Sequence, residues 1–259
     1  MNIRRIKIWL SRGWFHVVSL TSLLMLLCIP SKAQQNNMDS LLRRLEEFSK
    51  ETGVKVERIE KGHDYVDLGL SIKWATCNIG ADKPEDYGDY YAWGELQPKD
   101  VYSWETYKYC DGSYKTLTKY TDRACGKDGF SDNKSVLDPE DDVAHVKWGG
   151  NWSIPTKDEL EELRTQCTWT ITTLNGVKGY TVTSNVGGYT DRSIFMPATG
   201  MRIRQWTLST DTIGRFWGNS IEIDDDSDDA VYLDFNFSRG PGRFTLIRCF
   251  GQCVRPVCP

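Results

Sequence analysis

The sequence predicts an α+β fold, in which a single domain carries two short helices, small antiparallel sheets and long loops and is preceded by a helical leader. Three observations indicate this class. Residues 148–163 combine a glycine turn with a clear helix start. Several later segments alternate apolar and polar residues, as half-buried strands do, and residues 78–98 are rich in Gly, Pro, Asp and Tyr, which indicates loops with little helix. An apolar fraction of 39% suffices for a core in a chain of 259 residues.

Residues 1–33 are predicted to be a signal peptide. An apolar run, Val17–Ile29, is followed by small residues at Ser31 and Ala33, the two positions that signal peptidase reads. The segment starts with four positive charges: Arg4, Arg5, Lys7 and Arg12. A membrane anchor is the alternative, but the apolar run is short for a bilayer span. We therefore expect cleavage after Ala33 and no membrane insertion afterwards.

Removal of this segment makes the chain strongly acidic. Of the 32 Lys+Arg, 27 remain against all 36 Asp+Glu, a net charge of −9. Such a surface repels phosphate backbones and anionic lipids, so nucleic acid and membrane surfaces are poor candidates as partners. The predicted location is secreted, periplasmic or at the cell surface.

Residues 34–62 are predicted to form a helical leader or tether. Their apolar stripe has helical spacing and ends before Gly53, and it consists of Met38, Leu41, Leu42, Leu45 and Phe48. The helix is expected either to dock on the domain or to form a stalk. A short oligomerisation helix is the other interpretation, although it spans too few heptads for a stable coiled coil alone.

The domain itself is expected to span residues 63–259 and to begin with a hairpin of Tyr65–Leu70 and Ile72–Cys77. The composition of residues 78–98 predicts ordered loops and short strands with little helix. Residues 102–130 are polar and aromatic, which is typical of long functional loops or of loops held by disulfides.

The first domain helix is predicted to begin at Asp138, which would be its N-cap with Pro139 in the first helical position. Val143, Val146 and Trp148 would then face inward, and Gly149 would end the helix.

The central helix has the clearest signals in the chain. Thr156 and Glu159 have capping-box spacing, and Leu160, Leu163 and Cys167 form one apolar stripe. This stripe must be buried against strands, and the candidates are Gly179–Ser184, Ser193–Ala198 and Ala230–Phe237.

The last of these strands is expected to be half-buried. Its alternation places one set of residues on one face (Val231, Leu233, Phe235 and Phe237) and a second set on the other (Tyr232, Asp234 and Asn236). The Gly240-Pro241-Gly242 turn should return the chain so that Phe244–Cys249 pairs back.

A series of phrases in one order carries a resemblance to a known family. They are YVDLGLSIKWATCNIGA, GDYYAWGE, DPEDDVAHVKWGGNWSIPTKDELEEL, IFMPATGMR, GRFWGNS and VRPVC, and they cover roughly residues 64–258. This order resembles the secreted "major paralogous domain" family of Fibrobacter succinogenes, which is abundant in Bacteroidetes-type bacteria. The family is similar to C-type-lectin-like and sulfatase-modifying-enzyme folds. The resemblance therefore implies a C-type-lectin-like domain with long irregular loops, but no function.

Seven cysteines remain after cleavage: Cys77, Cys110, Cys125, Cys167, Cys249, Cys253 and Cys258. Disulfides are the default interpretation in an exported protein, although an odd number leaves at least one thiol unpaired or shared between chains. Cys110 and Cys125 bracket one loop and form the preferred pair, a crosslink worth about 3 kcal/mol.

Residues suited to catalysis are scarce. After cleavage only His63 and His145 remain as imidazoles, too few for a zinc site or a general base, and no Gly-x-Ser-x-Gly elbow exists. The sulfatase-activating relatives implied by the resemblance use two C-terminal cysteines with copper. Cys249 and Cys253 are similarly placed, but one residue closer together. Arg248 and Arg255 are the charges that would activate them, yet structural thiols are the favoured interpretation.

The acidic run at residues 224–229 is the candidate metal site. Asp224, Asp226 and Asp228 offer hard carboxylates at alternating positions, which suits calcium. The Gly and Glu of an EF-hand are missing, and a solvated turn between two strands explains the same residues. Calcium is therefore a possible cofactor, and otherwise none is expected.

Two tryptophans that stand among polar neighbours, Trp104 and Trp206, are candidate ligand-binding residues together with Arg204. Trp104 lies between Ser103 and Glu105, and Trp206 follows Arg204 and Gln205. Exposed aromatic residues beside hydrogen-bonding groups stack on sugars or anchor protein partners, although tryptophans can also cover a core from a loop.

These features favour an exported, non-catalytic recognition module, for example an adhesin, that binds a glycan or a host or bacterial surface protein. The alternatives are a copper-dependent thiol oxidase of the sulfatase-modifying kind and a structural surface protein assembled through the leader.

Overall fold

The computed structural model describes residues 6–8, 56–58, 62–121, 125–221 and 228–259. The chain divides into two units, residues 1–62 and 63–259. In the first, β1 (Ile6–Ile8) pairs antiparallel with β2 (Val56–Arg58). Most of the predicted signal peptide and leader lies outside the described residues.

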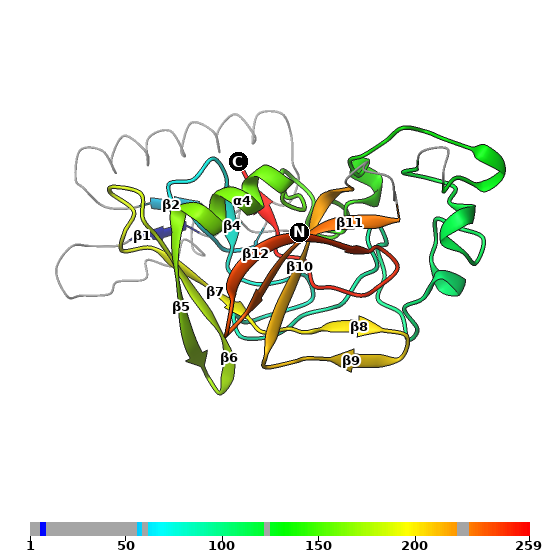
Figure 1. Cartoon of the computed structure of the whole chain (residues 1–259). Helices are drawn as coiled ribbons and strands as arrows, with labels where there is room; N and C mark the ends of the chain where they lie inside the picture. Colours follow the sequence, from blue (N-terminus) through cyan, green and yellow to red (C-terminus); the bar gives the residue numbers. More distant parts are fainter. Residues whose placement is uncertain (1–5, 9–55, 59–61, 122–124, 222–227) are drawn as a thin grey trace, which may run out of the picture. The chain divides into compact units, whose positions relative to one another are not determined.

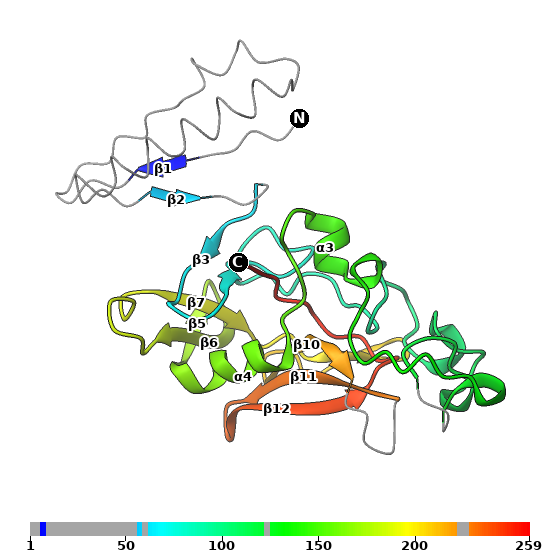
Figure 2. The same cartoon turned by 90° about the horizontal axis from the view of Figure 1, so that it is seen from above.

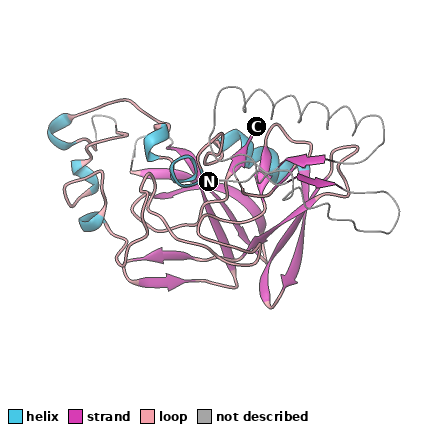
Figure 3. Cartoon of the chain, turned by 180° about the vertical axis from the view of Figure 1, so that it is seen from behind, coloured by secondary structure: helices cyan, strands magenta, loops and turns pink. Residues whose placement is uncertain are grey.

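The second unit is a mixed α+β structure that is mostly β (Figures 1 and 3). Its described residues contain two α-helices, α3 (Val143–Trp148) and α4 (Lys157–Gln166). Four 3₁₀ turns accompany them: Trp104–Thr106, Tyr114–Thr116, Lys127–Gly129 and Pro139–Asp141. The strands form three small antiparallel sheets and one two-stranded ribbon. The predicted fold class is confirmed at this level.

The first sheet has the order β13–β4–β3. The strand β3 (Tyr65–Val66) pairs with β4 (Lys73–Ala75), so the predicted first hairpin exists with shorter strands. The strand β13 (Val257–Cys258) pairs with the other edge of β4, which joins the two ends of the domain in one sheet.

The start of α3 differs from the prediction. Asp138 precedes only the 3₁₀ turn and caps nothing with its side chain. The N-cap is Asp142, whose Oδ1 accepts from the amides of Ala144 (2.9 Å) and His145 (3.0 Å). Val143 and Ala144 are the buried residues of the helix, and Val146 is 47% exposed instead of facing inward.

The two ends of α3 follow the sequence more closely. Val143 is buried, as expected, and Gly149 ends the helix with φ = 67°, a conformation that glycine adopts without strain. Trp148 is half-buried and its ring stacks on His63 at 3.7 Å.

The capping box of α4 is confirmed. The Thr156 amide donates to Glu159 Oε2 (2.7 Å), and the Glu159 amide donates to Thr156 Oγ1 (3.2 Å). Leu160 and Leu163 are fully buried. Cys167 is buried as well, but it is the first residue of a strand and not part of the helix.

The second sheet has the order β10–β11–β12, from Ile213–Ile221, Asp229–Asn236 and Gly240–Ile247. The predicted return of the chain after the Gly240 turn is therefore confirmed, although β12 already begins at that turn.

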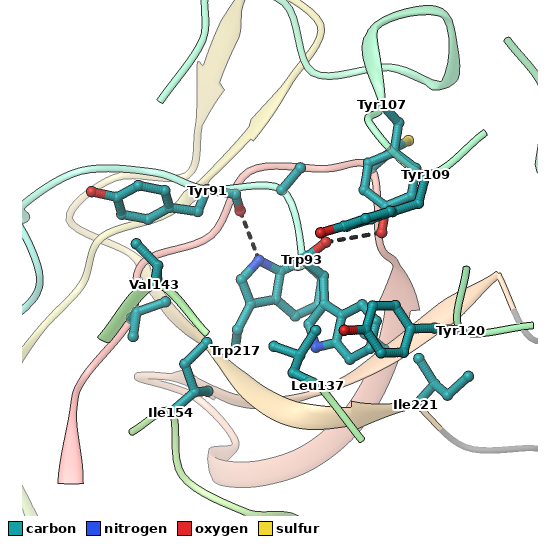
Figure 4. Close-up of a cluster of buried hydrophobic side chains, with 14 of the residues drawn as sticks. Tyr91, Trp93, Tyr107, Tyr109, Tyr120, Leu137, Val143, Ile154, Trp217 and Ile221 are labelled. Atoms are coloured by element: carbon teal, nitrogen blue, oxygen red, sulfur yellow. Dashed lines mark hydrogen bonds between the residues drawn. The ribbon is translucent and has the colours of Figure 1, made fainter. Parts of the chain in front are cut away.

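The central strand β11 separates two hydrophobic clusters. The helix core contains Val231, Leu233 and Phe235 together with Leu160 and Leu163 of α4. The aromatic core lies on the other face and includes Ala230, Tyr232, Trp93, Tyr107, Tyr109, Tyr120 and Trp217 (Figure 4). The predicted alternation is correct, but both of its faces are buried.

The buried carboxylate on β11 is compensated by arginine. Asp234 is 1% exposed and accepts from Arg215 Nε at 3.0 Å and from Arg239. An ion pair of this kind allows a strand to carry a charge inside the protein.

The third sheet has the order β5–β6–β7. The strands β5 (Cys167–Leu174) and β6 (Val177–Ser184) form a hairpin around Asn175-Gly176, whose φ values of 49° and 89° fit a tight two-residue turn. The strand β7 (Ser193–Pro197) completes the sheet.

The segment from Gly251 to Cys258 is buried throughout and crosses the interior of the unit (red in Figure 2). Its Gln252 exchanges backbone hydrogen bonds with Tyr91, its Cys253 carbonyl accepts from the Trp217 amide (3.1 Å), and its Val257 pairs with Ser153. The segment thus connects both cores and the first sheet.

Candidate recognition surface

The ribbon of β8 (Met201–Ile203) and β9 (Trp206–Leu208) carries one of the two predicted tryptophans (Figure 1). Its turn is Arg204-Gln205. Arg204 has φ = 52°, a left-handed conformation that costs a non-glycine residue about 1 kcal/mol.

Backbone pairing attaches the ribbon firmly to the domain. The Arg204 amide donates to the Tyr102 carbonyl (2.8 Å) and the Tyr102 amide donates back (3.0 Å). Two residues before Arg204, on β8, Arg202 exchanges backbone hydrogen bonds of 2.7 and 2.8 Å with Gly251. These bonds hold the strained turn in place.

Side chains reinforce this attachment. A Cβ at Gly251 would lie 2.7 Å from the Tyr102 ring, so the ring packs directly on the bare glycine backbone. The Tyr102 hydroxyl donates to the Tyr90 carbonyl (2.6 Å), and the Arg202 guanidinium lies 5.2 Å from the centre of the Tyr102 ring. Only glycine fits at position 251.

One face of the ribbon is apolar and open. The register pairs Met201 with Leu208 and Ile203 with Trp206, so these four side chains share a face, which we call the ribbon face. Trp206 is 61% exposed and Leu208 is 41% exposed, while Met201 and Ile203 are half-buried. Arg204 beside it is also exposed.

Trp104 does not share this exposure. It is half-buried at the start of a 3₁₀ turn, and its ring packs edge-on against Tyr107 at 5.6 Å and near Tyr114 at 6.4 Å. The Tyr102–Arg204 bridge brings the two tryptophan-bearing segments together, but only Trp206 is presented to solvent. The Trp104 ring therefore packs within its own loop.

The polar residues near the ribbon include a carboxylate. A hydrogen bond from Ser103 lowers the pKa of Glu105, and the positive charge of Arg204 adds to that shift. The exposed indole is therefore bordered by groups of both charges.

The acidic run lies mostly outside the described residues, which include neither Asp224 nor Asp226. Asp228 is described, and its carbonyl accepts from the Arg248 amide (3.0 Å). Within the described ranges no group of three or more His, Cys, Asp or Glu side chains is arranged to hold a metal. Calcium binding stays a prediction.

The predicted disulfide between Cys110 and Cys125 is not formed, and both are free thiols. Leu117 lies between them, because it pairs with Cys110 on one side and with Gly126 on the other. Two strand spacings separate the flanking segments by about 9.5 Å, beyond the roughly 7 Å over which two Cα atoms can be bridged. The Cys110 thiol donates instead to the Trp104 carbonyl (3.0 Å).

Cys249 and Cys253 do not face a common site. Cys249 belongs to the aromatic core and Cys253 to the helix core, and both are at most 1% exposed. Burial raises the pKa of each thiol to about 12. A nucleophilic thiol needs the opposite shift.

The two arginines expected to activate these thiols are structural. Arg255 is fully buried and donates to Asn78 Oδ1 (2.7 Å) and to the carbonyls of Ala75 (3.0 Å) and Phe195 (3.0 Å). Its burial lowers its pKa to about 10. Arg248 is also buried, and donates to the Tyr120 carbonyl (2.7 Å).

A cleft that the sequence does not predict lies between the third sheet and residues 76–84. Its volume is about 270 Å³, and no charged side chain lines it. The lining residues are Thr76, Pro84, Thr172, Leu174, Thr181, Ser193, Ile194 and Phe195. It contains none of the predicted site residues.

Within the part of the chain that the structure describes, no helix combines the length and apolar character needed to cross a bilayer. Comparisons of the chain with protein-family models, with curated proteins and with solved structures find no match.

Proposed function

We propose that the chain is an exported, non-catalytic recognition module, of the kind an adhesin uses, and that it binds its partner through the ribbon face. The observation that carries this proposal is Trp206, an indole 61% exposed on a ribbon that is fixed to the domain by paired backbone hydrogen bonds. A large aromatic side chain left in water at a rigid position is the usual anchor of a binding surface.

The rigid attachment matters because binding is opposed by the loss of conformational freedom. The bridges to Tyr102 and Gly251 order the ribbon before any partner arrives, so less entropy is lost on association. The strained Arg204 turn, kept where glycine or asparagine would be relaxed, is consistent with selection for its side chain.

A protein partner is favoured over a glycan. The neighbours of Trp206 on the ribbon face are Met201, Ile203 and Leu208, aliphatic side chains that suit an apolar protein surface. A glycan is the second candidate, since an indole flanked by Arg204 and Gln205 can stack on a sugar ring and bond its hydroxyls.

The test is binding of the exported chain to two sets of immobilised probes, a glycan array and a panel of extracellular-matrix and bacterial envelope proteins. Trp206→Ala should weaken whatever binding is found by roughly tenfold or more. Arg204→Asn, which relaxes the turn, should weaken binding without lowering thermal stability. Phe130→Ala is the matched control, because Phe130 is a 44% exposed aromatic residue that belongs to neither strand of the ribbon.

Two outcomes would contradict the proposal. One is binding that Trp206→Ala leaves unchanged, and the other is the absence of binding to either set. Selective binding to glycans would move the assignment from protein to glycan.

The oxidase alternative is less well supported. Its two thiols lie in different cores with raised pKa values, and the arginines beside them are bonded to backbone oxygens. A structural role through the leader depends on residues outside the described ranges.

Two further elements of the proposal rest on the sequence. Export follows from the signal-peptide pattern, and membership of the major paralogous domain family from the ordered phrases. A C-type-lectin-like architecture agrees with two short helices, several small antiparallel sheets and long loops. Calcium at the acidic run is a separate hypothesis, which a calcium titration of the melting temperature tests.

A further inference from the structure

The strand β5 has an open edge. It pairs with β6 on one side, and among the described residues no strand pairs with its other side (Figures 1 and 3). Exposed edges of this kind are templates for a further strand, and proteins that avoid such pairing protect them with charges, proline or bulges.

The register shows which backbone groups are open. The Asn185 amide donates to the Gln166 carbonyl, so that pair is hydrogen-bonded, and the hydrogen-bonded pairs of β5 and β6 continue at every second residue. The N–H and C=O groups of Trp169, Ile171 and Thr173 therefore point away from β6, toward the open edge.

The sequence of β5 contains none of the residues that hinder the pairing of an edge strand with a further strand. Cys167–Leu174 reads CTWTITTL, eight residues without a charge, a glycine or a proline, rich in β-branched types. The whole hairpin to Ser184 contains a single charged residue, Lys178. On an acidic chain this hairpin is a region almost without charge.

Two other edge strands carry features that hinder the addition of a further strand. On the same sheet, the outer edge of β7 is covered where Phe195 accepts a hydrogen bond from buried Arg255 (3.0 Å), and Pro197 has no amide to offer. The edge strand β12 carries Pro241 and Arg243. Protection is thus present at two edges and missing at β5.

Ile171 is the residue that an added strand would cover. It continues the side of β5 on which Cys167 and Trp169 pack into the helix core, yet it lies beyond that core and is 56% exposed. It is the second most exposed of the large hydrophobic side chains described, after Trp206.

We propose that β5 pairs antiparallel with β5 of a second copy of this chain, with Ile171 facing Ile171 at the two-fold axis. This register pairs Trp169 with Thr173 and Thr170 with Thr172 of the other copy. It satisfies the outward groups of all three residues in roughly six hydrogen bonds. The two three-stranded sheets become one sheet of six strands.

The second copy is the occupant that the sequence favours. Thr170 and Thr172 flank Ile171 symmetrically, so the strand complements itself when reversed, and no charge meets a like charge across the axis. A single strand pair is smaller than a standard interface of about 1,600 Å². The dimer is therefore concentration-dependent.

Sedimentation velocity of the exported chain over a concentration series tests this pairing. The wild type should dimerise, and Ile171→Lys and Ile171→Glu should each weaken dimerisation by roughly tenfold or more, because like charges then face each other across the axis. An equimolar mixture of the two variants should associate again, since lysine now faces glutamate.

Leu208→Lys is the matched control, a charge placed on an exposed leucine of the ribbon face, and it should leave dimerisation unchanged. Ile171→Thr preserves β-branching at this position and introduces no charge. It serves as the control for folding of the strand, and its melting temperature should match that of the wild type. The proposal is overturned by a wild type that stays monomeric to about 1 mM, by dimers that persist in both charged variants, by a mixture that does not associate, or by Leu208→Lys abolishing the dimer.

Discussion

Asp141 shows how a single carboxylate organises the polar loop. Its side chain is buried and accepts from Lys119 Nζ (2.6 Å) and the Tyr120 hydroxyl (2.7 Å), with Lys108 Nζ at 3.2 Å. Burial alone would raise the pKa of Asp141, but these hydrogen bonds, led by the one from Lys119, outweigh it and hold the pKa well below its usual range.

Asp141→Asn should therefore lower the free energy of unfolding by about 2 kcal/mol at pH 7. A carboxyl whose pKa is lower in the folded state contributes stability that is complete above its unfolded pKa of about 4 and is lost as the pH falls below it. Thermal melts from pH 7 to pH 3 should show the difference between wild type and variant shrinking below about pH 5.

Asp111→Asn is the control for this experiment, since Asp111 also pairs with a lysine but its side chain is 69% exposed. It should change stability by less than about 0.5 kcal/mol. A deficit of Asp141→Asn that stays constant down to pH 3 would contradict the ion-pair account.

The candidate site was partly predictable at the scale of residues. Trp206 could be selected because its neighbours are polar, and it is exposed. Trp104 has equally polar neighbours, but its ring packs against Tyr107 and Tyr114, and the polar sequence around it does not predict that the loop folds back in this way. Met201 and Leu208 could have been found from the short alternation on either side of Arg204-Gln205, a pattern typical of a hairpin.

Among the elements, α4 depends most clearly on a local signal. Its capping box satisfies two amides at the N-terminus that no helical carbonyl can reach.

Thr156→Ala should lower stability by about 1 kcal/mol in chemical denaturation, because the Glu159 amide loses its acceptor. Glu159→Ala should have a related effect, and the double variant should cost less than the sum of the two, since the residues act as one unit. Thr165→Ala, an exposed change in the last turn, should be close to neutral. Additive single effects would argue against a reciprocal cap.

The strand β5 shows where prediction of elements fails. The spacing of Leu160, Leu163 and Cys167 extends the helical pattern one residue into the strand, and the threonines that follow give no clear alternation. The Asn175-Gly176 turn between two β-rich runs was the available signal. The start of α3 was misplaced because Asp138 and Asp142 are both good N-caps, and only the amides of Ala144 and Ile154 select the second.

At the scale of the molecule, β11 determines whether the two cores unfold together. Leu233 is fully buried in the helix core, while its neighbour Tyr232 belongs to the aromatic core.

Leu233→Ala should lower the free energy of unfolding by about 2–5 kcal/mol. It should do so in one transition, seen alike by tryptophan fluorescence and by far-UV circular dichroism, because the shared strand couples the cores. Leu208→Ala, on the exposed ribbon face, should change stability by less than about 0.5 kcal/mol. Separate transitions for the two probes would show that the cores are independent.

The sequence pattern predicted that β11 alternates, but it could not predict that both faces are buried. That property comes from residues 91–120 packing on the side that carries Tyr232 and Asp234, a contact between segments far apart in the chain.

The buried segment Gly251–Cys258 has a consequence for how the protein matures. Every other strand and helix of the domain precedes it in the chain, yet it supplies the backbone partners of Tyr91, Ser153 and Trp217. Until those residues have been synthesised, the nascent chain cannot close its interior, so ribosome-bound intermediates should remain open to protease. A chain that stays open this long exposes the apolar side chains of both cores until its last strand has been made.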